Sequence, residues 1–110
     1  MRFNNVMIES VEYVLGPHRV TSSDLEERIS DTLARLGVRP GRLEAISGIR
    51  ERRFWDLGTM PSEIATLAAR KAIEMAGIDS QQIGCMVNTS VMRDYIEPSV
   101  ASLVHGNLKL

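Results

Sequence analysis

Apolar positions follow a strand-like pattern in three parts of this 110-residue chain. Residues 5–15 are rich in β-branched and aromatic side chains with a loose period of two, and they end at a Gly-Pro pair. Residues 49–55 alternate only weakly, which favours a short, partly exposed strand or an extended loop. The short apolar run at residues 83–87 is typical of a buried strand. The pattern therefore predicts three extended segments.

Helical periodicity separates and follows these segments. After Thr21, apolar side chains recur at helical intervals up to Gly37, and Ser23 and Glu26 have the spacing of a capping box. The apolar positions of this first helix are Leu25, Ile29, Leu33 and Leu36. Because hydroxyl side chains cap helix N-termini, Thr21, Ser22 and Ser23 can all supply the N-cap oxygen of this helix.

Two further helices are predicted. One runs over residues 61–76, because proline suits the first turn and Gly77 readily takes the left-handed conformation that ends a helix. The other covers residues 98–108 and is apolar on more than one face. A helix of this kind needs cover on both sides, so part of a larger α/β layer is expected.

The predicted element order is βαβαβα. Strands that alternate with helices favour parallel pairing and right-handed crossovers, so the fold class is α/β with a mostly parallel sheet. A sheet of only three strands would leave an apolar patch of several hundred Å² uncovered, a size typical of interfaces. We therefore expect an incomplete layered fold.

Composition limits the classes of function. The chain is 44% hydrophobic, as a globular domain requires, and its net charge is -1 with basic and acidic residues interspersed. No field of one sign is present to hold nucleic acid, and no apolar stretch reaches the length needed for membrane insertion. The single Cys85 can form no internal disulfide, so a cytoplasmic location fits best.

Three side chains are of types that often act in catalysis, but the residues near them in sequence do not support such a role. Cys85 lies inside the apolar run IGCMV with no neighbouring basic residue, so an inert core thiol is the simpler interpretation. His18 and His105 have no carboxylate or serine at triad spacing, and no pair of residues has zinc-ligand spacing. We expect no metal site.

A basic cluster is a stronger candidate. Three arginines stand beside two aromatic residues, and guanidinium groups bind phosphates such as those of coenzyme A; they are Arg50, Arg52 and Arg53. Neighbouring acids offer the alternative that the cluster forms salt bridges, with Glu51 and Asp56 as partners. The sequence leaves both interpretations open.

Residues 88–99 are the most informative segment. They follow the predicted strand 83–87, and open α/β sheets place ligands at the carboxyl ends of their strands. Glu97 precedes Pro98 and could cap the last helix, while Arg93 and Asp94 favour a loop ion pair over catalysis. A functional site, if the chain carries one, is expected here.

Three stretches in register resemble the thiolase superfamily, in its ketoacyl-ACP synthase III branch. Residues 48–53 (GIRERR) are similar to a TGIxxRR motif, residues 68–78 to AARKAL followed by AGI, and residues 88–99 end in the expected Pro-Ser. Within that branch, residues 53–56 (RFWD) and 93–99 (RDYIEPS) look most like the OleA-type enzymes, which condense two acyl-CoA molecules head to head.

The resemblance implies roles for particular residues. Ordinary synthase III enzymes have an aromatic residue before Pro-Ser, where this chain has Glu97. In the resembled enzymes this glutamate reaches into the partner subunit's site and removes the α-proton of an acyl thioester, and Ile96 would line the substrate site beside it. The implied reaction is a non-decarboxylative Claisen condensation of two fatty acyl-CoA molecules to a β-keto acid, as in olefin biosynthesis. Its implied partners are a second copy of the chain, pathway enzymes or acyl carrier protein, with no cofactor beyond coenzyme A thioesters.

The resemblance also implies what this chain lacks. Nothing in it matches the family's nucleophilic cysteine, its histidine or its asparagine, so residues 1–110 are expected to form the first part of the N-terminal half and to be inactive alone. The family's Trp and Arg before TGI are replaced, with Arg42 and Ile46 in this region. Two alternatives are a conventional 3-oxoacyl-ACP synthase III and, in another class, a stand-alone α/β binding or dimerisation module.

Overall fold

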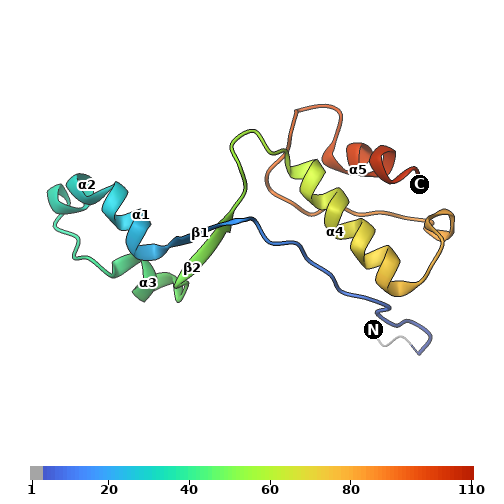
Figure 1. Cartoon of the computed structure of the whole chain (residues 1–110), viewed down its shortest axis with the longest axis horizontal. Coiled ribbons are helices and arrows are strands. Elements are labelled where there is room, and N and C mark those ends of the chain that lie inside the picture. Colours follow the sequence, from blue (N-terminus) through green and yellow to red (C-terminus); the bar gives the residue numbers. More distant parts are fainter. Residues whose placement is uncertain (1–3) are drawn as a thin grey trace. The chain divides into compact units, whose positions relative to one another are not determined.

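The structure is a computed structural model that describes residues 4–110, and these fall into two compact units (Figure 1). Leu15–Leu57 forms the first, here called the sheet unit. Gly58–Leu110 forms the second together with residues 4–14, here called the helical unit. Each unit has its own internal contacts.

The sheet unit contains one antiparallel ladder. Strand β1 (His18–Thr21) pairs with β2 (Glu51–Phe54), with His18 opposite Phe54 and Thr21 opposite Glu51. The chain between the strands forms three short helices, α1 (Ser22–Arg28), α2 (Ser30–Arg35) and α3 (Arg42–Ser47). The prediction of a short extended segment at residues 49–55 is confirmed by β2.

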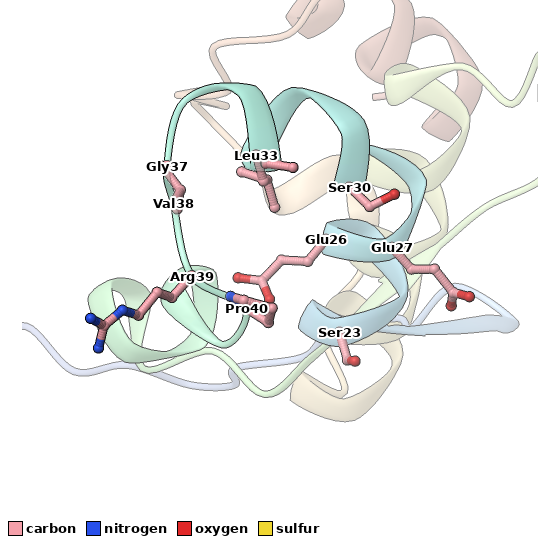
Figure 2. Close-up of a pocket in the computed structure, with 10 residues that line it drawn as sticks. Ser23, Glu26, Glu27, Ser30, Leu33, Gly37, Val38, Arg39 and Pro40 are labelled. Atoms are coloured by element: carbon pink, nitrogen blue, oxygen red, sulfur yellow. The ribbon is translucent and has the colours of Figure 1, made fainter.

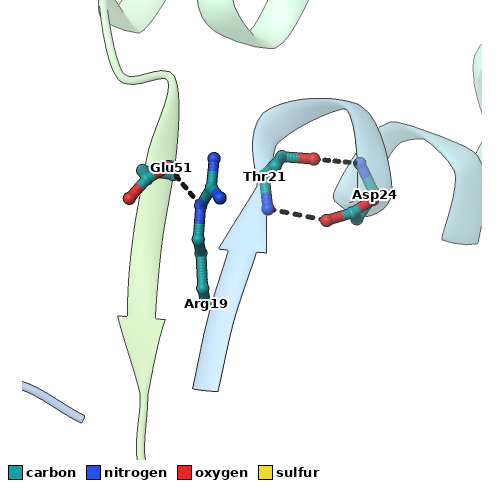
Figure 3. Close-up of polar contacts among 4 residues, drawn as sticks. All are labelled: Arg19, Thr21, Asp24 and Glu51. Carbon is teal, nitrogen blue, oxygen red and sulfur yellow. Dashed lines mark hydrogen bonds and ion pairs between the residues drawn. The ribbon is translucent and has the colours of Figure 1, made fainter. Parts of the chain in front are cut away.

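The first helix begins at a reciprocal cap, shown in Figure 3. The Thr21 hydroxyl accepts from the Asp24 N–H at 3.0 Å, and the Asp24 carboxylate accepts from the Thr21 N–H at 2.8 Å. These bonds hold the pKa of Asp24 below its ordinary value, chiefly through the Thr21 N–H. The predicted box of Ser23 and Glu26 is therefore wrong, because the cap lies two residues earlier.

Glu26 serves a different purpose. Its side chain is buried and crosses to the loop before α3, where its two oxygens accept the Gly41 and Leu43 N–H groups, each at 2.6 Å. This carboxylate thus supplies the N-terminal cap that α3 lacks, because the residue in the N-cap position, Gly41, has no side chain.

The helical unit is built on α4 (Pro61–Ala76), which has the predicted bounds and ends at Gly77 with a φ of 65°. A 3-10 turn, η1 (Ser80–Gln82), follows, and α5 (Val100–Leu108) packs against α4 (Figure 1). Val100 and Val104 of α5 are buried, and the Asn107 amide donates to the Thr66 hydroxyl of α4 at 3.1 Å. The last predicted helix thus exists but begins two residues later than expected.

The predicted strands at residues 5–15 and 83–87 are wrong for the part of the chain that the structure describes. Both segments are extended but join no ladder, and the two-stranded sheet of residues 4–110 is antiparallel rather than mostly parallel. A strand needs a neighbour for its backbone groups, and side chains hold the first segment to α4 instead. The Ser10 hydroxyl donates to the Ala72 carbonyl at 2.8 Å, and Lys71 pairs with Glu12 at 2.7 Å.

No helix formed by residues 4–110 is both long enough and apolar enough to cross a membrane.

Candidate functional site

The loop between η1 and α5 begins with a side-chain turn. The Asn88 side-chain oxygen accepts from the Ser90 N–H at 3.2 Å, and the Ser90 hydroxyl lies 2.8 Å from that oxygen and 2.9 Å from the Met92 carbonyl. Asparagine favours such turns because its short side chain can bond to the backbone two residues on. This turn redirects the chain at the start of the segment that was predicted to be functional.

Asp94 fixes the middle of the same loop. Its carboxylate accepts the Ser62 N–H at 3.0 Å, across 32 residues of sequence, and the residue is half-buried. Ser62 lies in the first turn of α4, where N–H groups have no partner within the helix and the helix dipole favours negative charge. The expected ion pair with Arg93 is not seen; Asp94 binds the helix N-terminus instead.

Glu97 lies at the far end of this loop, before a cis peptide bond to Pro98. It is exposed, and its carboxylate makes no hydrogen bond or ion pair within residues 4–110. The cap of α5 is Ser99, whose hydroxyl accepts from the Ser102 N–H at 3.2 Å. The interpretation of Glu97 as a helix cap is therefore not supported, since Ser99, two residues later, fills that position.

A hollow of about 380 Å³ is lined by this loop and the first turn of α5. Glu97 lines it together with Ile96, whose side chain is mostly exposed. The other lining residues are Asn88, Ser90, Val91, Met92, Arg93, Ser99, Val100 and Ala101. The structure thus brings two of the predicted site residues, the carboxylate and its apolar neighbour, to one surface.

The arginine cluster lies in the sheet unit, on and just before β2. Arg52 is half-buried and donates to the Ser22 hydroxyl at 2.9 Å, so it supports the start of α1. Arg50 and Arg53 are exposed, and their side chains make no hydrogen bond or ion pair with residues 4–110.

The acids expected to neutralise this cluster have other partners. Glu51 pairs with Arg19 of β1 (Figure 3), and the Asp56 carboxylate lies 2.7 Å from Nε2 of His18. Arg19 and Arg53 stand opposite each other in the ladder. Because like charges in opposite positions repel each other, the Arg19 side chain is favoured to point toward Glu51 instead. Two guanidinium groups of the cluster are left available to a ligand.

A larger hollow, of about 690 Å³, lies within the sheet unit between α1, α2 and the loop after α2 (Figure 2). Leu33 and Val38 contribute apolar surface, and Figure 2 shows the Glu26 side chain crossing toward the loop at Pro40. None of the predicted site residues lines this hollow. The hydrogen bonds of Glu26 to the loop account for its carboxylate, and Glu27, which also lines the hollow, is exposed.

The structure adds little support for a catalytic role of the remaining candidates, Cys85, His18 and His105. Cys85 is exposed, contrary to the expected core thiol, because its extended segment has no neighbouring strand within residues 4–110. His18 pairs with Asp56 at 2.7 Å, and His105 is exposed near the end of α5. No group of three or more His, Cys, Asp or Glu side chains gathers into a metal site in the described residues.

Two interactions of the site region escape sequence reasoning. The Asp94 bond to α4 and the Glu26 bonds to the α3 loop both join residues far apart in sequence, at separations of 32 and 15 to 17. The local pattern around Asp94 is that of a loop, and the local pattern around Glu26 is that of a helix face. Neither pattern indicates that the acid has a distant partner. The only available signal was that α3 and α4 lack a Ser, Thr, Asp or Asn in the N-cap position.

Comparison with known proteins gives a consistent result. The chain is 46% identical over 108 residues to an acyl-CoA:acyl-CoA alkyltransferase of Xanthomonas campestris and 42% identical to one of Shewanella oneidensis. Each match covers 98% of this chain, and the chain spans about a third of the length of these relatives, 32% and 31%. No family model matches the chain.

Solved structures agree with the sequence relatives. A crystal structure of Xanthomonas campestris OleA, in a variant with a glutamate replaced by aspartate, matches this chain with a TM-score of 0.87 at 45% identity. The match covers 99% of this chain and 33% of the OleA chain. A 3-oxoacyl-(acyl carrier protein) synthase III of Xanthomonas oryzae gives 0.87 at 48% identity, with coverage of 98% and 32%. The resemblance seen in the sequence and the partial thiolase-like fold are thus confirmed.

Proposed function

We propose that this chain is the N-terminal part of a thiolase-fold acyltransferase that joins two fatty acyl-CoA molecules to a β-keto acid. The observation that carries the proposal is Glu97, a carboxylate with no partner among residues 4–110 that lines a hollow beside exposed apolar side chains. The similarity to two enzymes named acyl-CoA:acyl-CoA alkyltransferase supports the choice of substrates.

Glu97 acts as a base in the proposed reaction. It takes the α-proton of one acyl thioester, and the electron pair of the broken C–H bond attacks the thioester carbonyl of the second acyl group. A C–C bond forms, the C–S bond of the second thioester breaks, and its sulfur leaves as a thiolate. Hydrolysis of the remaining thioester then gives the β-keto acid and coenzyme A. A side-chain base is needed because neither acyl chain carries a carboxylate whose loss could generate the carbanion.

The same proposal specifies the assembly and the ligands. Glu97 serves the site of a second copy of the chain, so the enzyme is a homodimer, and its nucleophile lies outside residues 1–110. Arg50 and Arg53 contact phosphate groups of coenzyme A or of a carrier protein, because their guanidinium groups are exposed and without carboxylate partners in the described residues. The thioesters are themselves activated, so the reaction needs no cofactor. The single cysteine is in keeping with a cytoplasmic enzyme.

A second candidate function is favoured by one observation. The Xanthomonas oryzae structure with 48% identity is named 3-oxoacyl-(acyl carrier protein) synthase III. Such an enzyme of fatty acid biosynthesis would condense an acyl group with a malonyl group by decarboxylation, and would not need Glu97 as a base.

The deciding experiment incubates the full-length protein with a long-chain acyl-CoA alone and analyses the products. Wild type is compared with Glu97→Gln, which keeps the size of the side chain but removes the base. Glu74→Gln is the matched control, because Glu74 is an exposed carboxylate on α4 that does not line the hollow. Acyl transfer to the enzyme is measured separately by mass spectrometry of the intact protein.

We expect wild type and Glu74→Gln to release coenzyme A and to form the β-keto acid or its derived ketone. Loss of a general base typically costs about 10²- to 10⁴-fold, so Glu97→Gln should lose condensation while acyl transfer survives. If product forms only after malonyl-ACP is added, the synthase III function is correct instead. An unimpaired Glu97→Gln variant would remove the base role.

A further inference from the structure

We infer that Asp94 is a positioning residue, which holds the loop that carries Glu97 against the N-terminus of α4. This inference rests on the proposed function, because it concerns how the proposed base is kept in place. Asp94 itself touches neither the hollow nor, in the proposed reaction, the reacting atoms. Its effect on the reaction would pass through Tyr95 and Ile96, the two residues that join it to Glu97.

The first part of the argument is the geometry of the anchor. The Asp94 carboxylate accepts the Ser62 N–H at 3.0 Å, and Ser62 is buried while Asp94 is half-buried. A charged acceptor at a helix N-terminus makes a stronger hydrogen bond than a neutral one, because the N–H groups there are unpaired and the dipole is favourable. This is the only hydrogen bond between residues 88–97 and α4 in the part of the chain that the structure describes.

A second anchor lies on the other side of Glu97. Val100, the first residue of α5, is buried, and α5 is held on α4 by the packing of Val104 and by the bond from Asn107 to Thr66 at 3.1 Å. Glu97 is therefore three residues from a fixed point in each direction, and both fixed points are held against α4. A short segment clamped at both ends has few conformations, although Glu97 makes no contact of its own that would fix it.

Removal of Asp94 would release one end of this segment. Residues 88–97 would then have no hydrogen bond to α4 among those described, and the position of the Glu97 carboxylate would vary. A displacement of about 1 Å of a catalytic group can cost as much as 10²-fold in rate, so precise support of this loop matters for proton removal. Steps that do not use Glu97 should be unaffected.

The same helix offers a matched control. Glu63 also places a carboxylate at the N-terminus of α4, where it accepts the Met60 N–H at 2.9 Å, but it comes from within the helix and makes no hydrogen bond or ion pair with the described residues of the loop. Loss of Glu63 weakens the helix start as loss of Asp94 does. It leaves the loop anchored, so the two variants separate a general effect on α4 from an effect on Glu97.

The experiment uses the full-length enzyme with a long-chain acyl-CoA and measures two rates. One is acyl transfer to the enzyme, which does not need the base, and the other is condensation to the β-keto acid. The variants are Asp94→Ala, Asp94→Asn, Glu63→Ala and Glu97→Gln, each with its thermal midpoint measured. Asp94→Asn keeps an oxygen that can accept the Ser62 N–H, so it tests the hydrogen bond rather than the folding of the chain.

We expect Asp94→Ala to slow condensation by about 10- to 100-fold with acyl transfer unchanged, Asp94→Asn to recover most of the rate, and Glu63→Ala to keep it. The inference is overturned if Asp94→Ala behaves like Glu63→Ala, if it slows both steps equally, or if Asp94→Asn is as impaired as Asp94→Ala. The Glu97→Gln variant tests the proposed function separately. The proposed function is wrong if Glu97→Gln condenses acyl-CoA at the wild-type rate.

Discussion

Gly16 is buried where the chain enters β1, and its backbone lies close to β2. A Cβ atom at this position would lie 2.3 Å from the Phe54 carbonyl oxygen, far inside van der Waals contact. Since the obstacle is backbone rather than a flexible side chain, the two strands would have to separate. The ladder of the sheet unit thus depends on the absence of a side chain at one position.

We expect Gly16→Ala to destabilise the β1 and β2 pairing by about 1–3 kcal/mol, the range usual for overpacking in a buried site. Hydrogen exchange of the ladder amides, measured in the full-length protein, would show faster opening. Gly106→Ala is the control, because a Cβ atom in that α5 position meets no atom within 4 Å of those described. Equal protection of the ladder in both variants would contradict the prediction.

Glu26 provides a second residue-scale prediction, on pH. The N–H groups of Leu43 and Gly41 hold the pKa of Glu26 below its ordinary value. Because the pKa is lower in the folded than in the unfolded chain, the carboxylate stabilises the fold at neutral pH, and this contribution is lost as the pH falls through the lowered pKa. The start of α3 should therefore loosen in acid.

The measurement is the hydrogen-exchange protection of the Gly41 and Leu43 amides, each corrected for the intrinsic effect of pH. We expect protection to fall in acid for wild type and to be reduced severalfold already at neutral pH in Glu26→Gln. Glu27→Gln is the matched control, since Glu27 is the exposed neighbour and its side chain makes no hydrogen bond with the described residues. Protection that stays constant with pH would show that the carboxylate bonds do not hold this loop.

At the scale of the element, the cap of α1 makes the clearest test. Thr21 and Asp24 exchange two hydrogen bonds, whereas Ser23 is exposed and its side chain makes none with the described residues. Replacement of an N-cap hydroxyl typically costs about 0.5–2 kcal/mol, so Thr21→Val should reduce the protection of the first-turn amides of α1 accordingly. Ser23→Ala should leave that protection unchanged. A larger effect of Ser23→Ala would mean that the cap predicted from the sequence is correct after all.

Sequence reasoning succeeded where an element is specified locally. Helix α4 has its predicted bounds because proline, a helical apolar period and Gly77 all lie within the element. The loop with Glu97 was singled out because its residues match a family pattern over a short stretch, and the role of Glu97 stays a prediction. Both inferences rest on information contained in fewer than twenty consecutive residues.

The failures share a non-local cause. Strand β1 has no alternation of its own, and it forms only because β2 lies more than 30 residues later and supplies a partner. The segments at residues 5–15 and 83–87 have the composition of strands but meet no partner within residues 4–110. Asp94 was assigned to a loop ion pair because its partner, Ser62, is equally distant in sequence. Pairing across such distances depends on the fold rather than on the local pattern.

At the scale of the whole molecule, the exposed apolar surface is the main feature that the described residues leave unexplained. Val6, Met7 and Ile8 are consecutive, so their side chains point to opposite faces of an extended segment, yet each is at least 73% exposed. Extended segments that are apolar on both faces are typical of strands covered on both sides. The loop of the helical unit adds more such surface, with Val91 and Ile96 also mostly exposed.

We therefore expect residues 1–110, expressed alone, to bind the dye ANS and to self-associate at micromolar concentrations, because exposed apolar patches and unpaired extended segments promote aggregation. Sedimentation velocity and ANS fluorescence would compare this chain with the full-length protein, which should do neither. The double variant Val6→Ser and Ile8→Ser should reduce dye binding, whereas the control Glu9→Gln should not. A monomer that binds no dye would show that these segments are stable without cover, and that the chain can fold as an independent module.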